Sequence, residues 1–251
     1  MTAAPCQDRG VQQRLPSLLD RPITFAHRGA RAEAPENTIE AFQLALRLGA
    51  SGLESDVWLT SYGAAVLDHD GVVRRRLGRT TPIAEVPRAA LPSHIPTLAD
   101  LYEQCGTGYH LSLDIRGGSG PTVVDVTREA APAMLERLWL CAEVDALLPL
   151  RGTGARLVNS TRLSRMKEGP ERRAANLSAD GIDAVNLHHT DWNGGLVALF
   201  HRFERVCFSW DLQEDHLLER HLRMGVDGVY SDYTDRMVDA YRAQIGGDPA
   251  P

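Results

Sequence analysis

The sequence predicts a single α/β domain folded as a (β/α)₈ TIM barrel, and three observations carry this prediction. Short β-type runs alternate with helical stretches along the chain, which is typical of a parallel sheet. Eight such runs occur, at residues 23–26, 52–58, 110–115, 138–143, 156–160, 183–188, 205–210 and 228–231. Eight strand–helix units in 251 residues match the usual size of this barrel, about 250 residues. An open doubly wound sheet is the alternative, but no G-x-G-x-x-G follows the first run.

The elements between these strands follow from periodicity and from residues that stop helices. A helix is expected at about 38–48, where Ile39, Phe42 and Leu46 recur at helical spacing and Gly49 follows. Residues 64–70 form a further extended run, and an irregular, arginine- and proline-rich excursion is expected at 71–96. Helices return at 97–105 and from about residue 121. We therefore expect an N-terminal extension at 1–22, a catalytic domain at 23–245 and a tail at 246–251.

Composition excludes several classes of protein. Hydrophobic residues make up 43 % and charged residues 24 % of the chain, which is ordinary for a globular domain. The net charge of −6 argues against nucleic acid as a partner. The sequence shows neither an apolar run of ~18 residues nor a secretory signal, so no stable membrane insertion is expected. The four cysteines are widely spaced, which favours a reduced, cytoplasmic protein.

Polar residues gather where the predicted strands end. His27 and Arg28 close the first strand, and Glu54 and Asp56 lie two positions apart on the second, so both acidic side chains face the same side. His69 ends the extended run that follows. Because active sites of such barrels lie at the carboxyl ends of the strands, these residues predict one shared site.

The third long strand adds Asp114 and, two residues later, Arg116. Unpaired carboxylates inside a barrel carry a large desolvation cost and therefore call for a cation. Oxygen ligands suit Mg²⁺ or Ca²⁺, so one such divalent ion is the expected cofactor. Two histidines, an arginine and this ion suit phosphodiester cleavage, with one imidazole removing a proton from the attacking hydroxyl and the other protonating the leaving oxygen.

The motifs in this order resemble those of the glycerophosphodiester phosphodiesterases. The resemblance rests on HRG at 27–29, PENT at 35–38, E-x-D-V at 54–57, HD at 69–70, IPTL at 95–98 and GVDGVYSDYTD at 225–235. It covers residues 23 to about 235, nearly the whole chain. It implies a TIM barrel, a bound Mg²⁺ or Ca²⁺, and hydrolysis of a small glycerophosphodiester to an alcohol and sn-glycerol 3-phosphate.

Carried over residue by residue, the resemblance implies that His27 and His69 are the acid/base pair and that Arg28 contacts the substrate phosphate. Arg116 and Trp210 are also expected to bind the substrate. Glu54, Asp56 and Asp114 would hold the metal. This chain departs from the family at two positions. The family's typical motif is Glu-Ile-Lys, whereas this chain has Asp114, Ile115 and Arg116. Asp is one methylene shorter than Glu, and a planar guanidinium replaces an ammonium.

Six further positions are candidates, the last two being the neighbours His188 and His189. Trp210 would form an apolar wall for glycerol or pack in the core, and Glu36 and Asn37 would brace the His27 loop or cap the next helix. Asp232 is expected to cap the last helix. His188, at the end of the sixth strand, or its neighbour would face the site.

Three alternatives stay open at this stage. A lysophospholipase D would use the same chemistry on a substrate that needs a long apolar groove. A toxin-like phospholipase D is disfavoured, because those proteins are secreted and disulfide-linked. A non-catalytic barrel that binds phosphate esters would be expected to lack a histidine or a metal ligand, whereas this chain keeps both histidines. The sequence predicts neither the alcohol released nor the oligomeric state.

Overall fold

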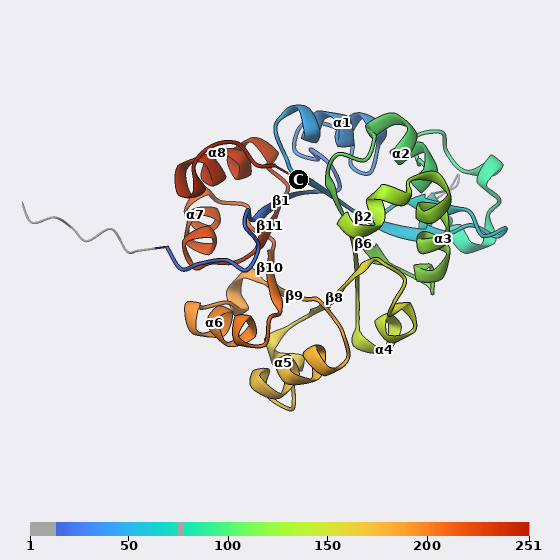
Figure 1. Ribbon diagram of the computed structural model, residues 1–251. Helices are drawn as coiled ribbons and strands as arrows, with labels where there is room; N and C mark the ends of the chain where they lie inside the picture. The colour runs from blue at the N-terminus through green and yellow to red at the C-terminus, as the bar shows by residue number, and fades with distance from the viewer. Residues whose placement is uncertain (1–13, 75–77, 251) are drawn as a thin grey trace, which may run out of the picture.

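The chain folds as a closed barrel of eight parallel strands, in a computed structural model that describes residues 14–74 and 78–250 (Figure 1). The strand order around the barrel is β1-β11-β10-β9-β8-β7-β6-β2, and β1 also pairs with β2, which closes the ring. The strands are β1 (Ile23–His27), β2 (Gly52–Leu59), β6 (His110–Ile115), β7 (Leu138–Ala142), β8 (Arg156–Thr161), β9 (Ala184–His188), β10 (Val206–Trp210) and β11 (Gly228–Ser231). The predicted (β/α)₈ barrel is confirmed.

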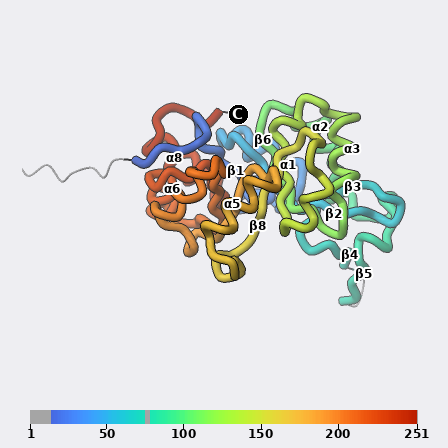
Figure 2. Tube along the Cα trace, turned by 60° about the horizontal axis from the view of Figure 1, so that its bottom comes forward, coloured from blue at the N-terminus to red at the C-terminus, as the bar shows by residue number. Residues whose placement is uncertain are grey.

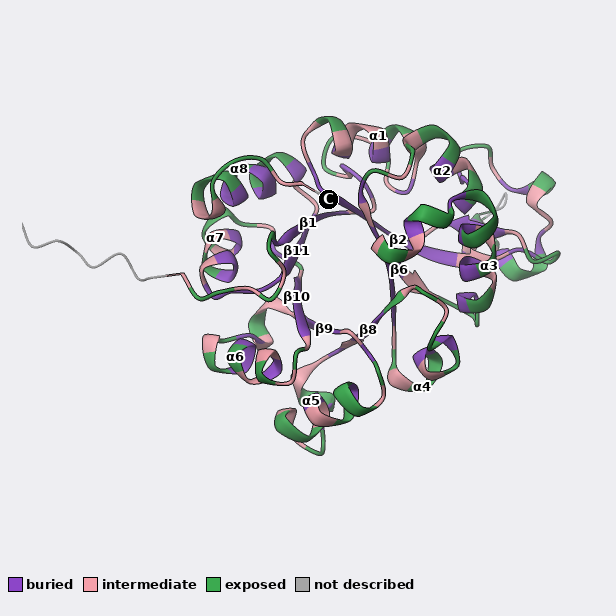
Figure 3. Cartoon of the chain, viewed as in Figure 1, coloured by how far each residue is buried: buried purple, intermediate pink, exposed green. Residues whose placement is uncertain are grey.

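A helix follows each barrel strand and packs outside it. They are α1 (Ile39–Arg47), α2 (Leu98–Cys105), α3 (Gly120–Ala130), α4 (Val144–Leu147), α5 (Pro170–Ala179), α6 (Gly194–Arg202), α7 (Asp215–Arg223) and α8 (Thr234–Ile245). Figure 3 shows the barrel strands buried and the helices buried on the side that faces them. This arrangement leaves the strand ends and their loops to form a site. Within the described residues, none of these helices is long and apolar enough to cross a membrane.

The excursion after β2 is more regular than the sequence indicated. β3 (Ala65–Leu67) adds antiparallel to β2 at the barrel's edge, and β4 (Val72–Arg74) pairs with β5 (Thr80–Pro82) as a separate two-stranded sheet. Two short 3₁₀ helices, at 83–85 and 88–90, lead back to α2. Figure 2 shows β4 and β5 projecting away from the barrel. Residues 75–77 of this arginine-rich stretch lie outside the described residues.

Aromatic side chains fill the interior of the barrel below the strand ends. Phe25 stacks on Tyr230 with ring centroids 4.5 Å apart, and Phe208 meets Trp139 edge to face at 4.9 Å. Gly228 lets Phe208 approach, since a Cβ there would lie 2.7 Å from its ring. Because these rings fill the interior, a cleft lined by polar side chains lies above them, at the carboxyl ends of the strands.

Residues 14–22 run along the opposite end of the barrel rather than standing free of it. The backbone N–H groups of Leu18 and Leu19 donate to the Asp227 carboxylate at 2.5 and 3.0 Å. The Leu15 N–H donates to the Arg223 carbonyl at 2.9 Å. The described part of the predicted N-terminal extension is thus attached to the barrel, and residues 1–13 lie outside the described part.

Candidate active site

Strand register places the predicted acidic residues in neighbouring pairs at one end of the barrel. His27 on β1 is level with Glu54 on β2, and Asp56 on β2 is level with Asp114 on β6. Alternation along β2 turns Glu54 and Asp56 to the same face. These residues line a cleft of about 730 Å³ at the carboxyl ends of the strands, together with His69 and others. The structure therefore brings both predicted histidines and the three predicted carboxylates to one cleft.

The carboxylates are held in conditions that disfavour three negative charges. Glu54 and Asp56 are only 6 % and 3 % exposed. Burial raises the pKa of Glu54, and the charges of Asp56 and Asp114 raise it further. Burial together with the charge of Asp56 raises the pKa of Asp114 to about 6. Such a cluster is stabilised by a cation of higher charge than one guanidinium carries.

Arg116 supplies positive charge to this cluster in the structure. Its guanidinium donates to Asp56 at 2.8 Å and to Asp114 at 2.7 Å, so it bridges the two strands. The ligand atoms of Glu54, Asp56 and Asp114 do not all lie within 4.8 Å of one another in the structure. The donor set still fits a hard divalent ion, because it consists of carboxylate oxygens. An ion would bind there only if the carboxylates moved closer together and the Arg116 guanidinium gave up part of its contacts with them.

His27 is oriented by Asp232, which follows β11. The His27 Nδ1 and Asp232 Oδ1 lie 2.6 Å apart, and the opposite nitrogen, Nε2, lies 3.7 Å from Glu54. Burial raises the pKa of Asp232, but the hydrogen bond and charge of His27 outweigh it, and the net shift is downward. The ionised carboxylate thus holds a proton on Nδ1 and leaves Nε2 free to act as a base. The predicted capping role of Asp232 is wrong, since α8 begins after Tyr233 without a side-chain cap.

His69 reaches the cleft from the segment after β3. Its Nδ1 lies 3.0 Å from Asp70 Oδ1, and its side chain is 41 % exposed. The hydrogen bond from His69 lowers the pKa of Asp70. Both histidines therefore have an aspartate on Nδ1, although His69 is more open to solvent than His27, whose side chain is 29 % exposed.

Arg28 occupies a turn that aims its side chain into the cleft. Its backbone is left-handed, with φ +57°, and its N–H donates to the Glu54 carboxylate at 3.0 Å. Glu36 receives two hydrogen bonds from the guanidinium, at 3.2 Å each, so it braces the loop. The Arg28 Nε is buried and has no hydrogen-bond partner among residues 14–74 and 78–250. A left-handed arginine with an unpaired buried donor is a strained arrangement of the kind that functional sites retain.

The remaining weaker candidates fall into separate roles. Thr38 caps α1 through its side chain, so neither Glu36 nor Asn37 does. The Asn37 Oδ1 accepts a hydrogen bond from Ser55 at 2.7 Å, on the face of β2 opposite Glu54 and Asp56. Trp210 lines the cleft at the end of β10. His188 packs edge to face against Trp210, with centroids 4.5 Å apart.

Comparison with known proteins relates the chain to one group of phosphodiesterases. The glycerophosphoryl diester phosphodiesterase family matches residues 27–129. A glycerophosphodiester phosphodiesterase from Caldanaerobacter subterraneus is 25 % identical, covering 88 % of this chain and 98 % of the relative. The "Probable glycerophosphodiester phosphodiesterase 2" of Mycobacterium tuberculosis is 29 % identical, covering 91 % of this chain and 94 % of the relative.

A solved structure shares the fold across nearly the whole chain. It is a phosphodiesterase from Oleispira antarctica in complex with the product sn-glycerol-3-phosphate, with a TM-score of 0.73, 21 % identity, and coverage of 88 % of this chain and 96 % of that chain. The matching motifs begin at His27, the residue at which β1 opens into the cleft. The chain is thus similar to the glycerophosphoryl diester phosphodiesterase family over residues 27–129, and to two named relatives over nearly its whole length.

Proposed function

We propose that this chain hydrolyses glycerophosphodiesters to an alcohol and sn-glycerol 3-phosphate. The observation that carries the proposal is the pair of cleft histidines, each with an aspartate on Nδ1, beside three carboxylates. The relatives' names support the activity, and the Oleispira antarctica structure holds the corresponding product. Both histidines and all three carboxylates are present, which argues against a barrel that only binds phosphate esters.

Glu54, Asp56 and Asp114 are the residues that would hold a divalent ion, Mg²⁺ or Ca²⁺. When bound, the ion neutralises charge on the phosphoryl oxygens and lowers the barrier to attack. The three carboxylates would hold the positive charge of the ion at the wall of the cleft. Arg116 keeps Asp56 and Asp114 together across β2 and β6.

His27 and His69 divide the proton transfers. One imidazole takes the proton of the attacking hydroxyl, of water or of the substrate's own glycerol, and the other gives a proton to the departing alcohol oxygen. The aspartate on each Nδ1 stabilises the imidazolium that forms when Nε2 accepts a proton. Arg28, whose buried Nε lacks a partner, donates to a phosphate oxygen and holds the phosphorus between the two histidines.

Release of glycerol 3-phosphate from a panel of glycerophosphodiesters tests the proposal. We expect turnover that EDTA abolishes and that added Mg²⁺ or Ca²⁺ restores. His27→Ala and His69→Ala should each lower kcat by about 10²–10⁴-fold, while His216→Ala, whose side chain is 71 % exposed, should keep it. Absence of product with either ion, or full activity in both cleft variants, would overturn the proposal.

The lysophospholipid alternative finds little support in the cleft. Its lining is mostly charged or hydroxylated, with apolar contributions from Ile115, Ala142, Ala146 and Trp210 rather than a long apolar groove. We therefore expect faster turnover of glycerophosphocholine than of a lysophosphatidylcholine. The three described cysteines are free thiols, which supports the proposal that the protein works in a reducing compartment such as the cytoplasm.

A further inference from the structure

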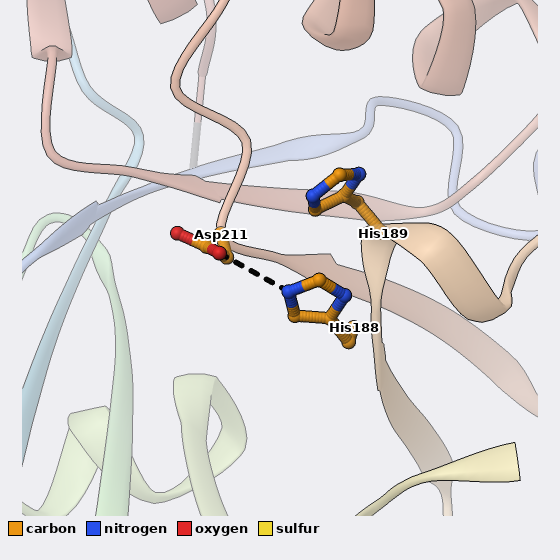
Figure 4. A group of neighbouring side chains, drawn as sticks. All are labelled: His188, His189 and Asp211. Atoms are coloured by element: carbon orange, nitrogen blue, oxygen red, sulfur yellow. Dashed lines mark hydrogen bonds and ion pairs between the residues drawn. The ribbon is translucent and has the colours of Figure 1, made fainter. Parts of the chain in front are cut away.

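A second cluster of metal-ligating side chains lies at the rim of the barrel, where β9 and β10 end and where Asp211 borders the cleft. His188 ends β9, His189 follows it, and Asp211 follows β10 (Figure 4). The parallel register that places Trp210 beside His188 brings Asp211 next to both histidines. One ligand atom from each of the three residues lies within 4.8 Å of the other two.

We propose that His188, His189 and Asp211 form a second metal site, which takes a divalent transition-metal ion such as Zn²⁺. Two imidazoles and one carboxylate are a ligand set of Zn²⁺ and related ions, whereas Mg²⁺ and Ca²⁺ prefer oxygen alone. The site differs from the proposed catalytic one in its residues, its strands and its chemistry. Because binding is measured directly, its test does not depend on the proposed activity.

The distances suit this ion. Metal–ligand bonds of about 2.0–2.1 Å in a tetrahedron place neighbouring ligand atoms ~3.3 Å apart. The His188 Nε2 already lies 3.1 Å from Asp211 Oδ2. The imidazole of His189 packs against that of His188 with centroids 4.4 Å apart, and its nitrogens have no hydrogen-bond partner among the described residues. Small rotations of His189 therefore complete the set.

Neighbouring groups hold the first two ligands in place, as outer partners of metal ligands do. The His188 Nδ1 accepts the Thr190 backbone N–H at 3.2 Å and lies 2.7 Å from the Thr190 hydroxyl. When Nε2 is the ligand, the proton moves to Nδ1 and the hydroxyl is the group that can accept it. The side-chain amide of Gln213 donates to Asp211 Oδ1 at 3.2 Å and leaves Oδ2 directed at the histidines. Trp210 packs edge to face against His188 and limits its rotation.

A second group with similar spacing is already committed to structure. His201, Cys207 and Asp227 also meet within 4.8 Å, but both Asp227 oxygens accept backbone N–H groups, from Leu18, Leu19 and Cys207. Burial raises the pKa of the Cys207 thiol, which disfavours the thiolate that a metal requires. The rim cluster, by contrast, is open to solvent at Asp211, whose side chain is 47 % exposed.

Equilibrium dialysis of the metal-free full chain against Zn²⁺, with excess Mg²⁺ to occupy the carboxylate site, tests the proposal. Wild type is expected to bind one Zn²⁺. The Asp211→Asn and His189→Gln variants should each bind Zn²⁺ at least 10-fold more weakly. Asn tolerates the left-handed backbone of Asp211, where φ is +65°. Thr190→Val, which removes only the outer hydroxyl, should weaken binding by about 10–100-fold.

The matched control is His216→Gln, which removes an exposed histidine outside the cluster and should leave the Zn²⁺ affinity unchanged. Circular dichroism and thermal midpoints without metal report whether each variant folds. If the Asp211→Asn variant does not fold, the His189→Gln variant alone tests the site. Equal Zn²⁺ affinity in wild type and both cluster variants would overturn the site. Equal loss of affinity in His216→Gln would overturn it as well.

Discussion

His27 and Asp232 are separated by 205 positions in the chain, yet their side chains are 2.6 Å apart. The pairing arises because β1 and β11 are neighbours in the closed barrel. A residue that follows the last strand therefore stands beside the residue that ends the first. At the residue scale, the cleft depends on such contacts, in which one charged group sets the orientation and protonation of another.

We expect Asp232→Asn to lower kcat by about 10²-fold while KM changes little. The amide nitrogen would face His27 Nδ1 as a donor, so the tautomer with a proton on Nε2 becomes favoured and the base is lost. Steady-state release of glycerol 3-phosphate measures both constants. Asp235→Asn, in the first turn of α8, is the control. Wild-type kcat in Asp232→Asn would contradict the positioning role.

Arg116→Lys is expected to tighten the binding of Mg²⁺ or Ca²⁺ by several-fold. The guanidinium contacts both Asp56 and Asp114, and an ammonium lacks the planar fork needed to hold two carboxylates at once. A freed carboxylate is then available to the ion. Isothermal titration of each metal-free protein gives the dissociation constants, and weaker binding by the lysine variant would show that Arg116 does not compete with the ion.

Much of the candidate site could be predicted because its residues lie at strand ends in recognisable motifs. His27, Glu54 and His69 all line the cleft, as the sequence indicated. Asp232 was missed because a carboxylate before a helix usually caps it. The available signal was topological: in a closed parallel barrel, the residue after the last strand meets the end of the first. The guanidinium bridge of Arg116 depends on side-chain geometry that no motif encodes.

At the scale of elements, β6 and β7 are joined by a partly buried contact between His110 and Trp139. The indole N–H of Trp139 donates to His110 Nδ1 at 3.3 Å, so this nitrogen must be unprotonated. Burial lowers the pKa of His110 to about 4, and the charges of Arg137 and Arg156 lower it further. The imidazole therefore stays neutral in the folded state at pH values where it is charged in the unfolded chain.

This depressed pKa predicts a loss of stability in acid. His110 binds a proton at about pH 6.5 in the unfolded chain and only near pH 4 in the folded protein. The contribution of neutral His110 to the unfolding free energy is therefore complete above pH 6.5 and is lost as pH falls toward 4. His110→Gln keeps an acceptor but does not titrate. Between pH 7 and 4, wild type should lose about 2–3 kcal/mol more unfolding free energy than this variant. Urea denaturation measures it, and parallel pH profiles would exclude the effect.

The barrel strands could be predicted to within one or two residues, because buried parallel strands appear as short apolar runs. The extended run at 64–70 contains β3, where only residues 65–67 pair. The β4–β5 pair escaped detection, since its strands have three residues each and β5 ends in Pro82. Such short edge pairs depend on packing against their surroundings more than on their own sequence. Val73, for example, packs with Ile83 and Val86 beside Trp58.

At the scale of the whole molecule, Asp227 connects the two ends of the chain. Its carboxylate is fully buried and accepts hydrogen bonds from Leu19, from Cys207 at the start of β10, and from His201 on α6. The aspartate precedes β11, so these contacts close the bottom of the barrel where the first and last strands meet.

Asp227→Asn is expected to lower the unfolding free energy by about 3 kcal/mol. The amide keeps one acceptor oxygen, so the hydrogen bonds to the other oxygen are lost inside the protein. Chemical denaturation of this variant and of Asp239→Asn, whose side chain is 76 % exposed, gives the comparison. A difference below 1 kcal/mol between the two variants would show that the contact does not stabilise the barrel.

The closure of β1 against β11 has a consequence for biosynthesis. β1 leaves the ribosome before the other seven barrel strands, but one of its two neighbours, β11, is the last of the eight to be made. Until then one edge of β1 has unpaired backbone groups, and exposed strand edges favour aggregation. A nascent chain that stalls before Gly228 would present two open edges, on β1 and β10. The ring can therefore complete its folding only after β11 has been synthesised.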